Sequence, residues 1–102
     1  MSKTIENKPT EIKVSGESLD RNGLFKLVIN FPSEKGIPIS EMRLRMRILD
    51  AIEVSEKNKE NLILEDNDFN LLKRLFDNFG WLQPHKDLLE LADHLEELLK
   101  QK

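Results

Sequence analysis

The stretch Asp66-Asn67-Asp68-Phe69-Asn70-Leu71-Leu72-Lys73-Arg74-Leu75-Phe76-Asp77-Asn78-Phe79-Gly80 holds the clearest structural signal in this 102-residue chain. Its apolar residues recur at the spacing of one helix face: Phe69, Leu71, Leu72, Leu75, Phe76 and Phe79. Acidic and amide side chains at 66–68 are typical of a helix start, and Gly80 stands where a C-terminal cap glycine belongs. The sequence therefore predicts an amphipathic helix here, with its apolar face in the core.

Beyond this segment, the sequence predicts a second amphipathic helix. Pro84 suits a helix N-terminus, and a leucine-rich stripe follows it: Leu88, Leu89, Leu91, Ala92, Leu95, Leu98 and Leu99. The width of the stripe favours packing on the home domain, while pairing with a second copy stays open. Trp81, the one tryptophan, lies between the two helices. It can be a lid over the core or an interface anchor.

Towards the N-terminus, Leu62-Ile63-Leu64 predicts a short strand. The segment 42–48 alternates polar and apolar residues like a strand, but the pattern breaks after Ile48, and Ser40 with Glu41 makes a good helix start. We favour a helix. In a helix, Arg43 and Arg47 share a polar face, whereas Arg45 falls inside the apolar arc.

Two segments in the first third of the chain have the period-two pattern of side chains that is typical of strands. They are Glu11–Val14 and Leu24–Phe31. Between them, Asp20-Arg21-Asn22-Gly23 resembles a tight turn, so we expect an antiparallel hairpin. Residues 1–10 are expected to be a flexible lead-in. The fold class is then a single α+β domain over residues 11–102, with a hairpin, one short strand and three helices in the order β-β-α-β-α-α.

Composition excludes several classes of protein. The chain has no cysteine, which removes disulfides, thiol catalysis and cysteine-based zinc sites and fits a cytoplasmic protein. No apolar run is long enough for a membrane span, and the first ten residues lack the apolar core of a signal peptide. The net charge is −3, and the excess of acid lies after residue 61. The acidic end is not the footprint of a nucleic-acid-binding protein, and the near-neutral first part has one only if its arginines cluster.

The residues that could carry chemistry are few. The chain has no Gly-x-Ser-x-Gly motif, and its four glycines are not spaced as in a phosphate-binding loop. We therefore expect no enzyme, no catalytic residue and no cofactor. Glu90, His94 and Glu97 share a helix face and could bind a divalent metal, but a solvated charged stripe is the favoured interpretation, so we predict no metal site. His85 is expected to be a capping or surface residue.

The triplet Arg43, Arg45 and Arg47 is the most unusual local feature. Such residues can contact nucleic-acid phosphates or an acidic partner. The favoured alternative is pairing with carboxylates of the same chain. The triplet also lacks the interleaved aromatic residues of a single-strand binder.

Part of the chain resembles small proteins encoded in tailed-phage and prophage genomes. The resemblance covers about residues 42–95, and it is carried by Met42–Glu53, Leu64-Glu65-Asp66, Asp68-Phe69, Leu71–Arg74, Trp81 and Lys86-Asp87-Leu88. It implies a phage accessory or virion-associated protein, located in the host cytoplasm or in the virion. It supplies no catalytic residue.

These observations together predict a non-enzymatic protein–protein interaction module whose partner is a second copy, a host protein or a phage protein. The candidate contact residues are Arg43, Arg45, Arg47 and Trp81. Two other functions stay open. One is a nucleic-acid-binding regulator that uses the arginines, and the other is an inhibitor of a host nucleic-acid enzyme, in which the acidic C-terminal helix mimics a nucleic-acid backbone.

Overall fold

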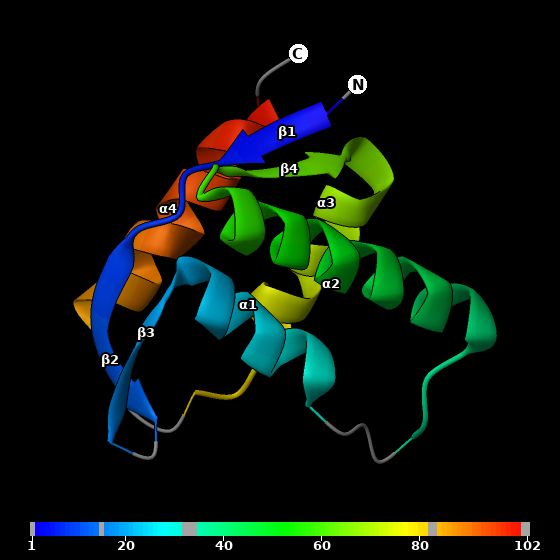
Figure 1. Cartoon of the computed structure of the whole chain (residues 1–102). Helices are drawn as coiled ribbons and strands as arrows, with labels where there is room; N and C mark the ends of the chain where they lie inside the picture. Colours follow the sequence, from blue (N-terminus) through cyan, green and yellow to red (C-terminus); the bar gives the residue numbers. More distant parts are fainter. Residues whose placement is uncertain (1, 15, 32–34, 82–83, 101–102) are drawn as a thin grey trace.

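The computed structural model describes residues 2–14, 16–31, 35–81 and 84–100, and over these residues the chain forms four strands and four helices (Figure 1). In chain order they are β1 (Ser2–Ile5), β2 (Pro9–Val14), β3 (Glu17–Asp20), α1 (Arg21–Asn30), α2 (Ile39–Asn58), β4 (Leu62–Glu65), α3 (Asp66–Asn78) and α4 (Lys86–Lys100). The predicted α+β class is confirmed. The element order differs from the predicted one, because an additional strand and an additional helix are present.

Strands β1 and β4 form a two-stranded antiparallel sheet in which Ser2 pairs with Glu65 and Ile5 with Leu62. Ile5, Leu62 and Leu64 are buried, while Ile63 faces outward. The predicted strand at 62–64 is therefore present. The expected flexible lead-in at residues 1–10 differs from the structure, because Ser2–Ile5 is part of this sheet.

Strands β2 and β3 form the hairpin of this fold. Val14 pairs with Glu17, and Gly16 has a φ of 83°, in the left-handed region that glycine readily adopts. The prediction that Leu24–Phe31 forms the second strand of the hairpin is wrong, because most of that segment belongs to α1.

Helix α1 begins at the residues that were expected to form a turn. The Asp20 carboxylate accepts a hydrogen bond of 2.8 Å from the Gly23 N–H, which makes Asp20 the N-cap. Gly23 allows a close approach, since a Cβ there would lie 3.2 Å from the Leu19 side chain. The buried residues then follow helical spacing: Leu24, Phe25, Val28 and Ile29.

Helix α2 confirms the favoured helix over residues 42–54. It ends at Asn58, and its C-cap residue Lys59 has a φ of 54°, in the left-handed region. Helix α3 confirms the predicted helix, but its ends differ from the prediction. Its N-cap is Glu65, with Asp66 and Asp68 in the first turn, and its C-cap is Phe79 in an extended conformation, so Gly80 is not the cap. Helix α4 confirms the C-terminal helix.

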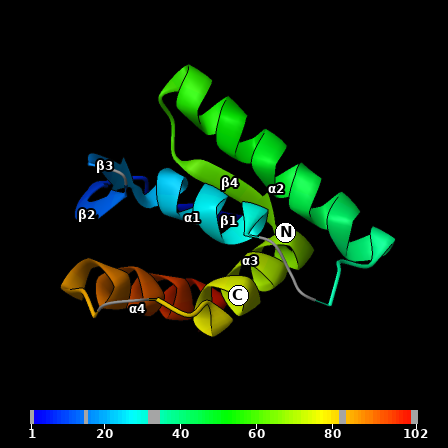
Figure 2. The same ribbon diagram turned by 90° about the horizontal axis from the view of Figure 1, so that it is seen from below.

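The elements share one hydrophobic core. Helices α2 and α4 lie on opposite sides of a layer that contains α1, α3 and the β1–β4 sheet (Figures 1 and 2). The fully buried side chains include Phe25, Ile48, Ile52, Phe69, Leu91 and Leu95. Within the described part of the chain, no helix combines the length and apolar character needed to cross a membrane.

Candidate interaction surface

The outward face of α2 exposes four large apolar side chains. Ile39, Met42, Met46 and Val54 keep 63, 44, 53 and 55% of their surface exposed. With about 3.6 residues per turn, these side chains fall on the side of the helix away from the core residue Ile48. Seen from below, α2 runs along the edge of the molecule, with α1, β4 and α3 on its inner side (Figure 2). We call this surface, residues 39, 42, 43, 46, 50, 53 and 54, the outer α2 face.

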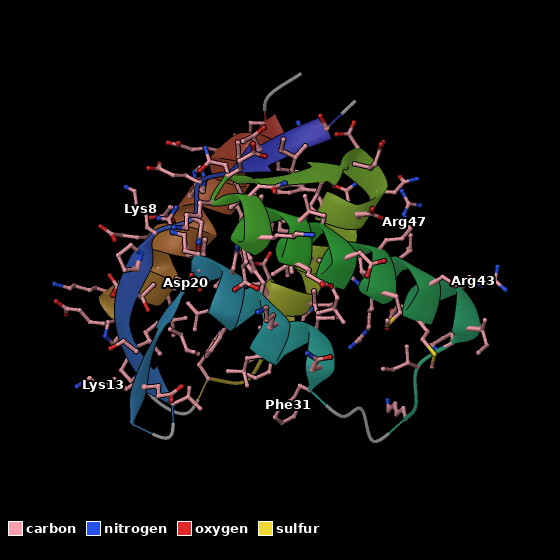
Figure 3. The ribbon with its side chains drawn as sticks, in the orientation of Figure 1. Lys8, Lys13, Asp20, Phe31, Arg43 and Arg47 are labelled. Carbon is pink, nitrogen blue, oxygen red and sulfur yellow. The ribbon has the colours of Figure 1, made fainter. Side chains whose placement is uncertain are left out.

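The outer α2 face also carries charge. Arg43 points away from the body of the molecule (Figure 3). Arg43, Asp50 and Glu53 are exposed, and none of the three forms an ion pair with another described residue. Arg43 is therefore the member of the predicted arginine triplet that is available to a partner.

Arg45 has a different role, inside the molecule. It is 8% exposed, and its guanidinium donates to the Ile29 carbonyl at 2.8 Å and to the Glu41 carboxylate at 2.9 and 3.2 Å. The other Glu41 oxygen accepts a hydrogen bond of 2.6 Å from Arg74. Arg45 thus ties the end of α1 to α2 and, through Glu41, to α3. The expectation that Arg45 lies in the apolar arc is correct, and its charge is occupied internally.

Arg47 is exposed like Arg43, but it is paired with a carboxylate like Arg45. Its guanidinium is 3.3 Å from the Asp68 carboxylate at the start of α3. Asp68 is buried, and burial raises its pKa above the usual value, although the nearby Arg47 lowers it. The three arginines therefore do not form one basic stripe, and two of them pair with carboxylates of the same chain.

Trp81 belongs to a chain of aromatic contacts. Its ring lies 5.6 Å from that of Phe76 and 4.5 Å from that of Phe79, between ring centres. Phe79 in turn contacts Phe31, which is 56% exposed. Trp81 is partly buried and packs against the core, a placement that fits the lid interpretation.

The predicted face of Glu90, His94 and Glu97 does not bring ligand atoms together among the described residues. Glu90 and Glu97 are exposed. Burial, followed by the nearby Arg21, lowers the pKa of His94. Its Nε2 atom is buried and has no hydrogen-bond partner within the described residues. Both effects favour the uncharged form of His94, which lies partly buried beside the core residues Leu91 and Leu95 of the same helix.

A different group, Glu11, His85 and Asp87, places three potential ligand atoms within 4.8 Å of one another. Hydrogen bonds explain this proximity. The Asp87 N–H donates to His85 Nδ1 at 3.1 Å, and the Glu11 N–H donates to the Asp87 carboxylate at 2.8 Å. His85 therefore caps α4 as expected, and the group ties β2 to α4. The positive end of the α4 dipole also disfavours a cation there.

A polar cavity of about 360 Å³ lies where β3 ends and α2 ends. It is lined by Asn7, Asp20, Ser55, Glu56, Lys59, Glu60 and Asn61. Several of the polar side chains that line it already form hydrogen bonds within the chain. Asp20 accepts hydrogen bonds from Gly23 and Asn7, and Ser55 bonds to Asn22 and to the Glu60 carbonyl. These bonds hold the start of α1 against the end of α2, so the cavity has a structural explanation.

The apolar residues of the outer α2 face were not predicted as contact residues, although the sequence contains a signal for them. Ile39, Met42 and Met46 are spaced i, i+3 and i+7, on the side of the helix opposite the core residues. The chain matches no family model, no curated protein and no solved structure. Its function must therefore be inferred from its own geometry.

Proposed function

We propose that this chain is a non-enzymatic protein–protein interaction module and that the outer α2 face is its contact surface. The observation that supports this proposal is the gathering of exposed apolar side chains on one helix face. Of the nine large hydrophobic residues that are exposed in the described chain, four lie there. Fully burying a side chain of this size contributes about 1.5–3 kcal/mol, so a partner that covered the exposed part of each would gain a share of that free energy.

Arg43 suits the same role. Arginine is enriched at protein interfaces, and charges around an apolar centre fix the orientation of the partner. The nucleic-acid alternative is weaker, because Arg45 and Arg47 are engaged by Glu41 and Asp68. If the resemblance to phage proteins reflects common origin, the partner is a protein of the phage or of its host, met in the host cytoplasm or in the virion.

Site-specific crosslinking tests this proposal. The chain has no cysteine, so Met46→Cys creates a single attachment point for a photoactivatable label. Leu89→Cys, on the outer side of α4 and 70% exposed, is the matched control. Both labelled variants are illuminated in extracts of the cells in which the chain naturally works.

We expect position 46 to give one dominant protein adduct, which mass spectrometry identifies, and position 89 to give none. The adduct should disappear when an excess of unlabelled wild-type chain competes, but not when a Met42→Lys, Met46→Lys variant competes. A dominant adduct at position 89, or none at position 46, would contradict the proposal.

A further inference from the structure

We propose that the outer α2 face binds a second copy of this chain, as an antiparallel pair of α2 helices around a twofold axis close to Met46. This inference rests on the proposed function and names its partner. It comes from the order of the charges along α2. Arg43 stands in the first half of the face, whereas Asp50 and Glu53 stand in the second half.

Four residues of the outer α2 face, Ile39, Arg43, Asp50 and Val54, are arranged symmetrically about a point between Met46 and Arg47. Ile39, Arg43, Met46, Asp50 and Val54 follow one another at intervals of three or four residues, so they remain on one side of the helix. In an antiparallel pair, each residue faces the one equally far from the axis on the other copy. An axis between Met46 and Arg47 sets Arg43 opposite Asp50, and Ile39 opposite Val54. Both apolar and charged contacts are then satisfied in one register.

Charge argues against the other pairings of this helix. A parallel pair would set Arg43 against Arg43 and Asp50 against Asp50, which like-charge repulsion disfavours. The antiparallel pair uses the same patch on both copies, as a twofold dimer requires. Moreover, these charged residues have no ion-pair partner within the described chain, so the contact would not have to break internal pairs.

The leucine stripe of α4 is a poorer candidate for the seam between two copies. Leu88, Leu91, Leu95 and Leu98 are buried against the home core, with exposures of 9, 0, 0 and 7%. The outer side of α4 carries the exposed acids Glu90, Asp93, Glu96 and Glu97, which would repel the same side of a second copy. The stripe that the sequence offered for dimerisation is thus already occupied, and the outer α2 face is not.

The expected dimer is a weak one. Helix α2 has 20 residues and is about 30 Å long, so a single pair of helices gives an interface at the small end of the range. Its charged contacts are exposed, which predicts weaker association at high salt. Sedimentation velocity over a concentration series up to ~1 mM should show a monomer–dimer equilibrium, because an interface of this size is typically weak.

Charge exchange tests the register. In a homodimer of Arg43→Glu, the introduced carboxylate faces Asp50 of the other copy. In a homodimer of Asp50→Lys, Glu53→Lys, the lysine introduced at position 50 faces Arg43, and the one at position 53 lies about one turn away. Each variant alone should therefore dimerise ~10-fold less tightly or worse than wild type, since close like charges oppose association. In an equimolar mixture, both contacts of the mixed dimer pair opposite charges, so dimerisation should return. Circular dichroism verifies that each variant is folded.

Crosslinking provides a measurement of which residues meet in the dimer, made at a concentration where sedimentation shows the dimer to be populated. Purified Met46→Cys should form a covalent dimer with a short bismaleimide, because helices in contact lie about 8–10 Å apart and position 46 lies beside the axis on both copies. Purified Leu89→Cys should form no covalent dimer under the same conditions, although its outer α2 face is unchanged. A wild-type monomer at every concentration, a mixture that fails to recover, or equal crosslinking at both positions would overturn the inference. If position 46 instead crosslinks to a different protein in extracts, the interaction module stands and the dimer does not.

Discussion

The Arg45 guanidinium offers the sharpest test of how the helices are held together, because its contacts are known atom by atom. We consider Arg45→Met, which keeps most of the aliphatic volume and removes the charge. Three charge-assisted hydrogen bonds are lost, and the Ile29 carbonyl at the end of α1 loses its partner. A buried acceptor left unpaired costs about 1–3 kcal/mol. Breaking a buried ion pair by removing one member costs about 3–5 kcal/mol.

The full cost of breaking a buried ion pair does not apply to Arg45→Met, because Glu41 is partly exposed and keeps its contact with Arg74. We therefore expect Arg45→Met to lower the free energy of unfolding by about 2–4 kcal/mol, below the cost of a fully buried pair. Urea denaturation followed by circular dichroism measures it, at a protein concentration where the chain is monomeric.

The matched control is Arg43→Met, the same substitution two residues earlier on the same helix. Arg43 is exposed and has no ion-pair partner among the described residues, so its loss should change stability by less than about 0.5 kcal/mol. A double variant of Arg45→Met with Glu41→Gln should lose less than the sum of the two single variants, because the two residues share one contact. If Arg45→Met and Arg43→Met have equal effects, the internal role assigned to Arg45 is refuted.

Three further predictions concern the core and its titratable groups. Phe76→Ala should cost about 3–5 kcal/mol in urea denaturation, because the ring is 3% exposed and contacts Phe25 and Trp81; a loss well under 1 kcal/mol would contradict its place in the core. The folded-state pKa of Asp68 is raised, so its carboxylate lowers stability at neutral pH, and this cost disappears as pH falls through the raised pKa. Asp68→Asn should therefore gain most, relative to wild type, at neutral pH and least in acid; an advantage that is constant with pH would refute this. The pKa of His94 is lowered from 6.5, so the unfolded chain binds the proton more readily, and wild-type stability should fall as pH drops below that value. His94→Gln should remove that part of the fall, and identical pH profiles for the two proteins would show that His94 does not contribute.

The sequence predicted the helices with a strong apolar face. Residues 69–76 and 88–98 repeat their apolar side chains at helical spacing over two to three turns, and both segments are helices in the structure. The same reasoning favoured a helix at 42–54. It also placed Arg45 on the inner side, and Arg45 is buried there. These predictions succeeded because a sustained periodic pattern outweighs any one residue that departs from it.

Helix α1 was mistaken for a strand because its pattern fits both structures. Phe25, Leu27, Ile29 and Phe31 alternate, yet Leu24, Phe25, Val28 and Ile29 are the residues that the fold buries. The Asn22-Gly23 pair was taken for a hairpin turn, whereas the Asp20 carboxylate accepts from the Gly23 N–H and starts a helix. In ten residues, tertiary contacts with α2 and α3 decide between the two structures, and no local pattern reports them.

The candidate surface was predicted only in part. Arg43 was named, but it was grouped with Arg45 and Arg47. Glu41, four residues before Arg45, is a partner that the sequence offers, whereas Asp68 is distant in the sequence and meets Arg47 only in the folded chain. Strand β1 was missed for a similar reason. Its four residues include one large apolar side chain, Ile5, and its partner strand lies far along the chain. The sequence of a short polar segment gives little indication of its contacts with distant segments.

The long sequence separation between β1 and its partner strand β4 affects the order in which the chain folds. Closing a loop of about sixty residues to join Ser2 to Glu65 costs entropy that only a largely assembled core can offset. The β2–β3 hairpin joins two strands that are adjacent in the sequence and can form early, whereas β1 must dock late. On the ribosome, Ile5 stays exposed until β4 has emerged. Docking of β1 then completes the β1–β4 sheet and covers Ile5, which is fully buried in the folded chain.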